Sequence, residues 1–130
     1  MELKAGIKGY CEVEVVRENT AAALGSGLLE VFATPAMIAL MEQTACQSVL
    51  PYLDEGMGTV GTRLEISHDA PTPIGMKVRC ESTLTEVSGR KLVFEVEAFD
   101  DMERVGHGRH ERFIINSEKF RVKAEGKGKA

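Results

Sequence analysis

VFATPAMIALMEQTACQSVLPYL, residues 31–53, is the stretch of the chain that decides the fold. We expect Thr34 to be the N-cap of a helix, because its hydroxyl can accept a hydrogen bond from an unpaired backbone N–H of the first turn. Pro35 follows at the first helical position, where its missing N–H costs nothing and its fixed φ suits a helix. The stretch therefore predicts one long helix with a defined start.

A carboxylate interrupts the apolar face of this helix. Ile38, Ala45 and Val49 recur at helical spacing, and Glu42 falls on the same face. An unpaired buried carboxylate is costly, so Glu42 should have a partner or a chemical role. The alternative is that Glu42 lies at the edge of the apolar stripe and extends into water.

Composition limits the class of protein. A chain of 130 residues with 43% hydrophobic and 28% charged residues is typical of one soluble globular domain, here residues 1–130. It contains no run of eighteen apolar residues that would span a membrane, and its first residues lack the apolar core of a signal peptide. We therefore expect a cytoplasmic protein without a membrane partner.

Charge and cysteine usage exclude two further classes. A net charge of -4 argues against nucleic acid as the main partner. The three cysteines, Cys11, Cys46 and Cys80, are far apart and include no CxxC pair. They predict reduced thiols and neither a disulfide framework nor a zinc site.

The rest of the chain reads as strands and turns. Alternating or apolar runs separated by turn residues predict strands at 8–17, 59–69, 77–87, 91–100 and 105–116. Small residues at 19–27 predict a mobile connection, either a lid or a linker, and 118–130 predicts a partly ordered tail. Residues 70–75, APTPIG, contain two prolines that make the bend after the second strand rigid.

One long helix followed by a meander of long strands is an α+β pattern. The sheet needs a cover for its apolar face, and only this helix is long enough to provide it. The sequence therefore predicts a hotdog fold, in which a curved antiparallel β-sheet wraps around one long central α-helix. Because long sheet edges are a liability when they stay unpaired, we expect a homodimer, with pairing of dimers into tetramers left open.

Several residues outside the helix can carry chemistry. His68 lies at the end of the second strand, where an exposed turn residue is the plain alternative. Gly61 interrupts the same strand and marks either a simple bulge or the close approach of another group. Arg112 in the last strand can bind a phosphate or carboxylate, or form a surface ion pair. His107 and His110, three residues apart, point to opposite faces and make a poor chelating pair.

Known catalytic motifs do not assign the reaction. The chain has no GxSxG, Walker A or GxGxxG motif, so an α/β-hydrolase, P-loop or Rossmann protein has no support. Composition and spacing alone stop at a compact, dimeric α+β domain with a buried glutamate and a histidine at a strand end.

Longer motifs resemble a known family. The segments ATPAMIALME, VGT and SHDAPTPIG, together with HGRHERFIINSEKF, resemble the fluoroacetyl-CoA thioesterase-like branch of the hotdog thioesterases over roughly residues 31–120. The resemblance implies that Thr34, Glu42 and His68 act together in catalysis. It also implies that Gly61 lines the acyl pocket and that Arg112 binds substrate.

The segment before the helix departs from the members specific for fluoroacetyl-CoA. Those members carry aromatic lid residues there, whereas this segment, ALGSGLLEVF, has Gly25 and Leu28 at the corresponding places and no aromatic residue until Phe32. Gln43 also stands where those enzymes have a tryptophan. The resemblance therefore implies a thioesterase without a strong preference for fluoroacetyl-CoA.

The reaction that the resemblance implies is hydrolysis of a short- or medium-chain acyl-CoA to the free acid and CoA. It needs no metal and no cofactor beyond the coenzyme A of the substrate. Thr34 would position or attack the carbonyl, and Glu42 would serve as base or nucleophile with His68 as its proton partner. The alternatives are a non-catalytic protein that binds acyl-CoA or a small acid on the same fold, and a hotdog dehydratase, which normally lacks this threonine.

Overall fold

The predicted helix is present as α2 (Thr34–Val49) in a computed structural model that describes residues 2–129. Its N-cap position differs from the sequence prediction. Ala33 has the extended backbone of an N-cap (φ -75°, ψ 142°), and Thr34 is the first helical residue with Pro35 after it. The Thr34 hydroxyl does not cap the helix, because it is hydrogen-bonded to His68 instead.

All five predicted strands are present, with ends that shift by up to three residues. A helix follows the last strand. The elements are β1 (Lys8–Glu14), η1 (Arg17–Asn19), α1 (Ala21–Leu24), α2, η2 (Leu50–Tyr52), β2 (Met57–His68), β3 (Lys77–Ser88), β4 (Lys91–Phe99), β5 (Arg104–Asn116) and α3 (Ser117–Lys127).

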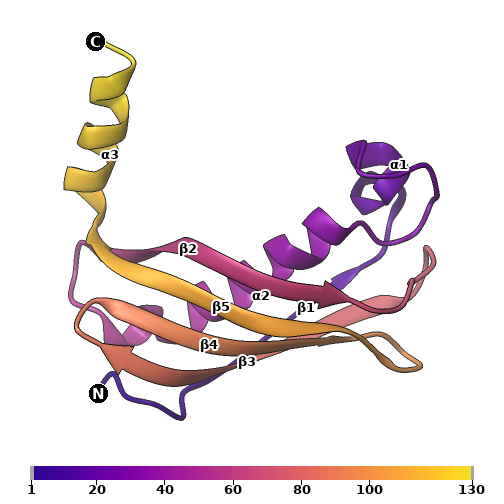
Figure 1. The fold of residues 1–130 in the computed structure, drawn as a ribbon, viewed down its shortest axis with the longest axis horizontal. Helices are drawn as coiled ribbons and strands as arrows, with labels where there is room; N and C mark the ends of the chain where they lie inside the picture. The colour runs from indigo at the N-terminus through magenta and orange to yellow at the C-terminus, as the bar shows by residue number, and fades with distance from the viewer. Residues whose placement is uncertain (1, 130) are drawn as a thin grey trace.

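The five strands form one antiparallel sheet in the order β1-β3-β4-β5-β2. The sheet curves, and α2 lies along one of its faces (Figure 1). Side chains of α2 such as Met37, Met41 and Val49 are fully buried against the inward-facing residues of β3 and β4, among them Leu84 and Phe94. This is the predicted hotdog fold, with β1 and β2 as its two edge strands.

A bulge in β2 sets which of its residues face the helix. Gly61 pairs with Arg112 of β5, but Arg63 pairs with Glu111, so Thr62 is an extra residue in the ladder. Side chains alternate along a regular strand, and residues seven apart would point to opposite faces. Because of the extra residue, Gly61 and His68 both face α2.

The connection before α2 is more regular than the sequence predicts. Residues 17–24 form η1 and α1, and backbone hydrogen bonds fix the segment that follows. The N–H of Ala21 donates to the carbonyl of Val31 at 2.8 Å, and the N–H of Phe32 donates to the carbonyl of Thr72 at 2.9 Å. The chain therefore enters α2 beside the proline-containing bend that follows His68.

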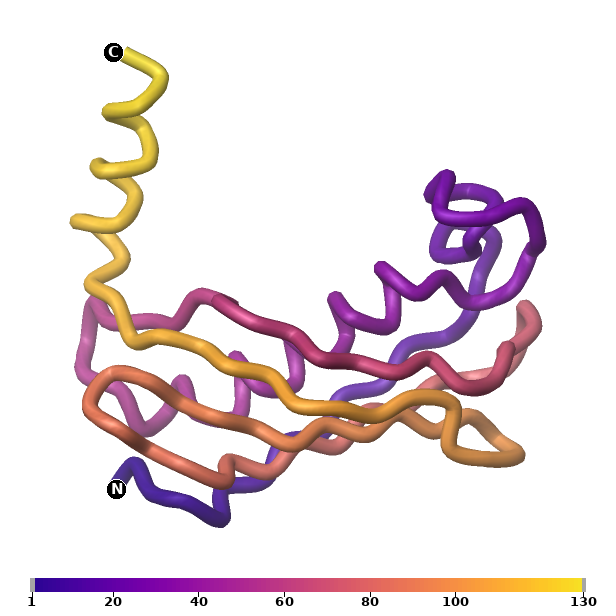
Figure 2. The backbone as a smooth tube through the Cα atoms, in the orientation of Figure 1, coloured from indigo at the N-terminus to yellow at the C-terminus, as the bar shows by residue number. Residues whose placement is uncertain are grey.

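The C-terminal segment also differs from the predicted partly ordered tail, because it forms α3. The Asn116 side chain caps the helix by accepting from the N–H of Lys119 at 3.0 Å. Arg121 is paired with Glu118 and Glu125 at helical spacing. No residue of α3 is buried, and the helix stands away from the sheet as a continuation of β5 (Figure 2).

Candidate functional site

Thr34 and His68 form the first of two polar groups beside α2. Thr34 begins the helix, His68 ends β2, and the Thr34 Oγ1 atom lies 2.7 Å from His68 Nδ1. The rigid bend predicted after His68 is held by the N–H of Asp69, which donates to the carbonyl of Val105 at 2.7 Å. The end of β2 and the start of α2 thus bring a hydroxyl and an imidazole together, whereas the family resemblance implies His68 as the proton partner of Glu42.

The environment of His68 favours the neutral imidazole. Burial lowers its pKa, and the neighbouring Asp69 carboxylate raises it to a smaller extent. The other ring nitrogen, Nε2, is buried and has no hydrogen-bond partner within residues 2–129. A neutral His68 can accept the Thr34 proton at Nδ1.

A cavity of about 260 Å³ opens at this pair. Small and apolar side chains from the segment before α2 and from the bend after β2 form most of its wall. The residues that line it are Ala21, Ser26, Val31, Phe32, Thr34, His68, Asp69, Ala70 and Pro71. The Thr34 hydroxyl is therefore open to a small molecule.

Glu42 belongs to the second polar group. Its side chain is 39% exposed, so the residue lies at the edge of the apolar stripe, but it also has a charged partner. The Glu42 Oε2 atom lies 3.5 Å from Nη1 of Arg112, whose side chain is only 7% exposed. Gly61 lies against the same carboxylate, and a Cβ atom added there would collide with Oε2. Gly61 thus marks a bulge and a close approach together.

A network that reaches two strands fixes Arg112. Its Nε donates to Thr59 Oγ1 at 2.8 Å, and its Nη2 donates to the Thr59 carbonyl at 2.9 Å. Its Nη1 lies 3.1 Å from Nε2 of His110, which is fully buried. Sequence reasoning gives His110 no role in the site and describes it only as half of a poor chelating pair with His107. The available signal is its spacing of two from Arg112, which puts both side chains on one face of β5.

The two groups are separate within one chain. Thr34 and Glu42 are eight residues apart on α2, which corresponds to about 12 Å along the helix axis. Thr34 and His68 are in contact, whereas Glu42 contacts Arg112 and Gly61. The three residues expected to act together are thus divided between two places along the same face of α2.

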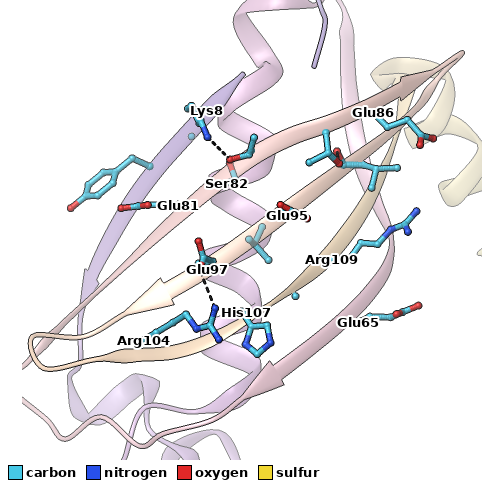
Figure 3. Close-up of a pocket in the computed structure, with 17 residues that line it drawn as sticks. Lys8, Glu65, Glu81, Ser82, Glu86, Glu95, Glu97, Arg104, His107 and Arg109 are labelled. Atoms are coloured by element: carbon cyan, nitrogen blue, oxygen red, sulfur yellow. Dashed lines mark hydrogen bonds and ion pairs between the residues drawn. The ribbon is translucent and has the colours of Figure 1, made fainter. Parts of the chain in front are cut away.

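A larger hollow lies on the opposite face of the sheet. Its volume is about 1040 Å³, and charged side chains such as Glu81, Glu95, Glu97 and Arg109 line it (Figure 3). Two of the lining residues, Arg104 and Glu97, pair with each other at 3.1 Å, and Arg109 pairs with Glu111 outside the hollow. None of the residues around it is Thr34, Glu42 or His68. The smaller cavity is the better candidate site, because it contains a hydroxyl and a base in contact.

Residues 2–129 contain no group of three or more His, Cys, Asp or Glu side chains arranged to hold a metal ion. No helix in this part of the chain is both long and apolar enough to cross a membrane.

Known proteins resemble this chain in sequence and structure. Residues 15–118 match the family described as fluoroacetyl-CoA-specific thioesterase. A fluoroacetyl-CoA thioesterase of Streptantibioticus cattleyicolor is 42% identical over 98 residues, which make up 75% of this chain and 70% of that protein.

Solved structures give the same relationship. A mutant of the fluoroacetyl-CoA-specific thioesterase FlK, crystallised with fluoroacetate and CoA, superposes with a TM-score of 0.86 at 35% identity, over 91% of this chain and 99% of that one. A hypothetical Thermus thermophilus protein, a thioesterase superfamily member, superposes with a TM-score of 0.87 at 28% identity, over 95% and 92% of the two chains.

Proposed function

Since the chain belongs to the fluoroacetyl-CoA-specific thioesterase family and is a thioester hydrolase, we propose that it converts a short- or medium-chain acyl-CoA to the free acid and CoA. The observation that carries the proposal is the 2.7 Å contact between Thr34 Oγ1 and His68 Nδ1 at the wall of a cavity. A hydroxyl beside a neutral imidazole is the arrangement that an acyl-transfer nucleophile needs.

The first half of the proposed reaction uses Thr34 and His68. His68 Nδ1 takes the Thr34 proton as the hydroxyl oxygen attacks the thioester carbonyl. Free backbone N–H groups in the first turn of α2, at the positive end of the helix dipole, stabilise the oxyanion. The C–S bond then breaks, and the imidazolium returns the proton to the departing sulfur of CoA. Water hydrolyses the resulting acyl-threonine and releases the acid.

Glu42 is the proposed base for that water, and this role requires a second copy of the chain. Within one chain, Glu42 lies about 12 Å along the helix axis from Thr34, too far to share a substrate carbonyl. The edge strand β2 carries both groups, with Gly61 beside Glu42 at one end and His68 at the other. If a second subunit is placed so that its β2 runs in the opposite direction beside this one, the Gly61 end of one strand lies at the His68 end of the other. Glu42 of the partner subunit then lies near Thr34.

Antiparallel pairing of β2 with its own copy makes this exchange. Side chains along the β2 edge are largely exposed, including Thr62, Arg63 and Leu64. A twofold axis midway between Gly61 and His68, near Leu64 and Glu65, places Gly61 of each copy opposite His68 of the other. The proposed enzyme is therefore a homodimer with two shared sites, in which acyl-CoA lies along the interface.

The first experiment measures release of free thiol from a panel of acyl-CoAs. We expect turnover of several short- or medium-chain acyl-CoAs. When the reaction is stopped rapidly with acid, the acyl group should be found attached to Thr34. Binding of acyl-CoA without thiol release would overturn the proposed reaction. An acyl group on Glu42 would reverse the roles of the two residues.

A second experiment tests the shared site by mixing two inactive variants, Thr34→Val and Glu42→Gln. In a mixed dimer, one shared site combines intact Thr34 from one subunit with intact Glu42 from the other. Random exchange of subunits should therefore restore about a quarter of wild-type activity, since half of the dimers are mixed and each has one intact site. No recovery, or sedimentation as a pure monomer, would show that the site is not shared.

A further inference from the structure

We propose that His110 is a positioning residue for Glu42, which as a neutral imidazole holds Arg112 against the carboxylate and on protonation releases it. The inference rests on the proposed function, in which Glu42 acts on the substrate, but His110 itself lies behind Arg112. Five hydrogen-bonding contacts around these side chains carry it.

The first contact fixes the tautomer of His110. The imidazole is fully buried on β5, and its Nδ1 lies 2.9 Å from the carbonyl oxygen of Arg63. A carbonyl only accepts, so Nδ1 carries the hydrogen and donates. In the neutral ring, Nε2 then has a lone pair and no hydrogen. It accepts from Arg112 Nη1, 3.1 Å away.

The remaining contacts fix Arg112 in one orientation. Nε and Nη2 both donate to Thr59, to its hydroxyl and its carbonyl. These two bonds hold one side of the rigid guanidinium, and the contact of Nη1 with His110 Nε2 holds the other side, which faces Glu42 Oε2. One Nη1 hydrogen is directed to His110, which leaves the other for the carboxylate.

Protonation of His110 would make its contact with Arg112 repulsive. Two N–H groups, each on a cation, would then face each other across 3.1 Å in a buried place. Burial lowers the pKa of His110, and Arg112 acts in the same direction. The carbonyl of Arg63 and the carboxylates of Glu42 on α2 and Glu111 on β5 act against them. Phe94 of β4, the other ring nearby, carries no charge, with its centroid 6.2 Å away.

His110 also connects this group to the bulge. Arg63, whose carbonyl accepts from His110, is the first paired residue after the extra residue of β2. The bulge in turn lets Gly61 face α2 beneath Glu42. The imidazole therefore contacts both structures that lie against the Glu42 carboxylate, which are the Arg112 side chain and the bulged part of β2.

Two substitutions of His110 separate its acceptor role from its bulk. His110→Gln keeps an acceptor at the place of Nε2 but cannot gain a charge, whereas His110→Leu keeps bulk and removes the acceptor. We expect His110→Leu to lower kcat by about tenfold or more, and His110→Gln to retain most of it at pH 7.5. His107→Gln on the outer face is the matched control and should leave kcat unchanged.

The pH profile provides the readout that a purely structural role would not change. In the wild type, both His68 and His110 must be neutral for activity. On the acid side, the slope of log kcat/KM against pH should therefore approach two, one for each protonation. In His110→Gln the slope should approach only one. Profiles of equal steepness, or equal kcat in the Leu and Gln variants, would overturn the inference.

A measurement on the free protein keeps this inference separate from the proposed function. NMR of the ¹⁵N-labelled imidazole of His110 should show hydrogen on Nδ1 and none on Nε2 at pH 7.5. A tautomer protonated at Nε2 would overturn the inference whatever the substrate is. A wild-type protein that releases no thiol would instead overturn the proposed function and leave the NMR result standing.

Discussion

Gly61 lies so close to Glu42 that a single added carbon at position 61 would occupy the space of the Oε2 atom. The same carbon would also lie 3.2 Å from His110 and 3.3 Å from Arg112. A glycine of β2 therefore faces the group of three polar side chains, and its lack of a side chain makes room for the carboxylate.

Gly61→Ala should consequently displace Glu42 while leaving the fold intact. The atoms that the new methyl meets are ends of side chains, and that of Glu42 can move toward water, so the melting temperature should change little. Loss of the carboxylate from its place should lower kcat by about tenfold or more in a thiol-release assay. Gly58→Ala on the same strand meets only the Ser117 hydroxyl, at 3.1 Å, and is the matched control. Equal kcat in the two variants would contradict the assigned position of Glu42.

Thr34→Val tests the hydroxyl with almost no change in shape. Because Thr34 is exposed, we expect the free energy of unfolding to change by no more than about 0.5 kcal/mol. Thiol release should fall by about 10²-fold or more, since the group that His68 contacts is gone. His68→Ala should act likewise, and His107→Ala, which breaks only a contact with Asp69, should not. Similar losses of activity in the two histidine variants would show that His68 is not the specific base.

Asp69→Asn tests the electrostatic control of His68. The Asp69 carboxylate raises the pKa of His68 against the larger lowering caused by burial. Removing the charge should therefore lower the pKa further, so that His68 stays neutral to a lower pH. The part of the acid limb of kcat/KM that belongs to His68 should move to lower pH, and NMR titration of the His68 ring should move with it. A shift of the His68 pKa to higher pH in Asp69→Asn would contradict the role of the Asp69 carboxylate.

The segment before α2 and the wall of the cavity at Thr34 predict weak discrimination between small acyl groups. Leu28 is 95% exposed, Gly25 has no side chain, and Phe32 is the one aromatic residue among those that line the cavity. We therefore expect kcat/KM for fluoroacetyl-CoA to exceed that for acetyl-CoA by less than about 10³-fold, which corresponds to about 4 kcal/mol. A larger preference would show that fluorine recognition does not need aromatic residues before the helix.

The sequence predicts the sheet and its helix well, because alternation and helical spacing report directly on burial. It groups Thr34 with His68 only through the family resemblance. It assigns the Thr34 hydroxyl to capping, since an N-cap threonine and a threonine bonded across the fold look alike in one dimension. The distance of Glu42 from that pair can be calculated from the helix rise. The family resemblance nevertheless groups all three residues, so it gives no sign that they lie apart within one chain.

His110 shows a second limit of sequence reasoning. Arg63 lies 47 positions away along the chain and is brought to His110 by the register of β2 on β5, and Glu42 lies 68 positions away and is brought there by the packing of α2 on the sheet. A lone histidine in a strand gives no sign of which backbone carbonyl fixes its tautomer. Long-range register decides that, and register depends on the bulge.

The extra residue at Thr62 has a consequence for how β2 can change in length. Gly61 and His68 are an odd number of positions apart, and the bulge restores the parity that puts both on the helix side. Removing the extra residue itself would leave the two positions six apart in a regular strand, still on one face, whereas removing one residue while keeping the bulge would turn one of them outward. A change of one residue in the length of this strand is therefore compatible with the site only when it also removes the bulge or adds a second one.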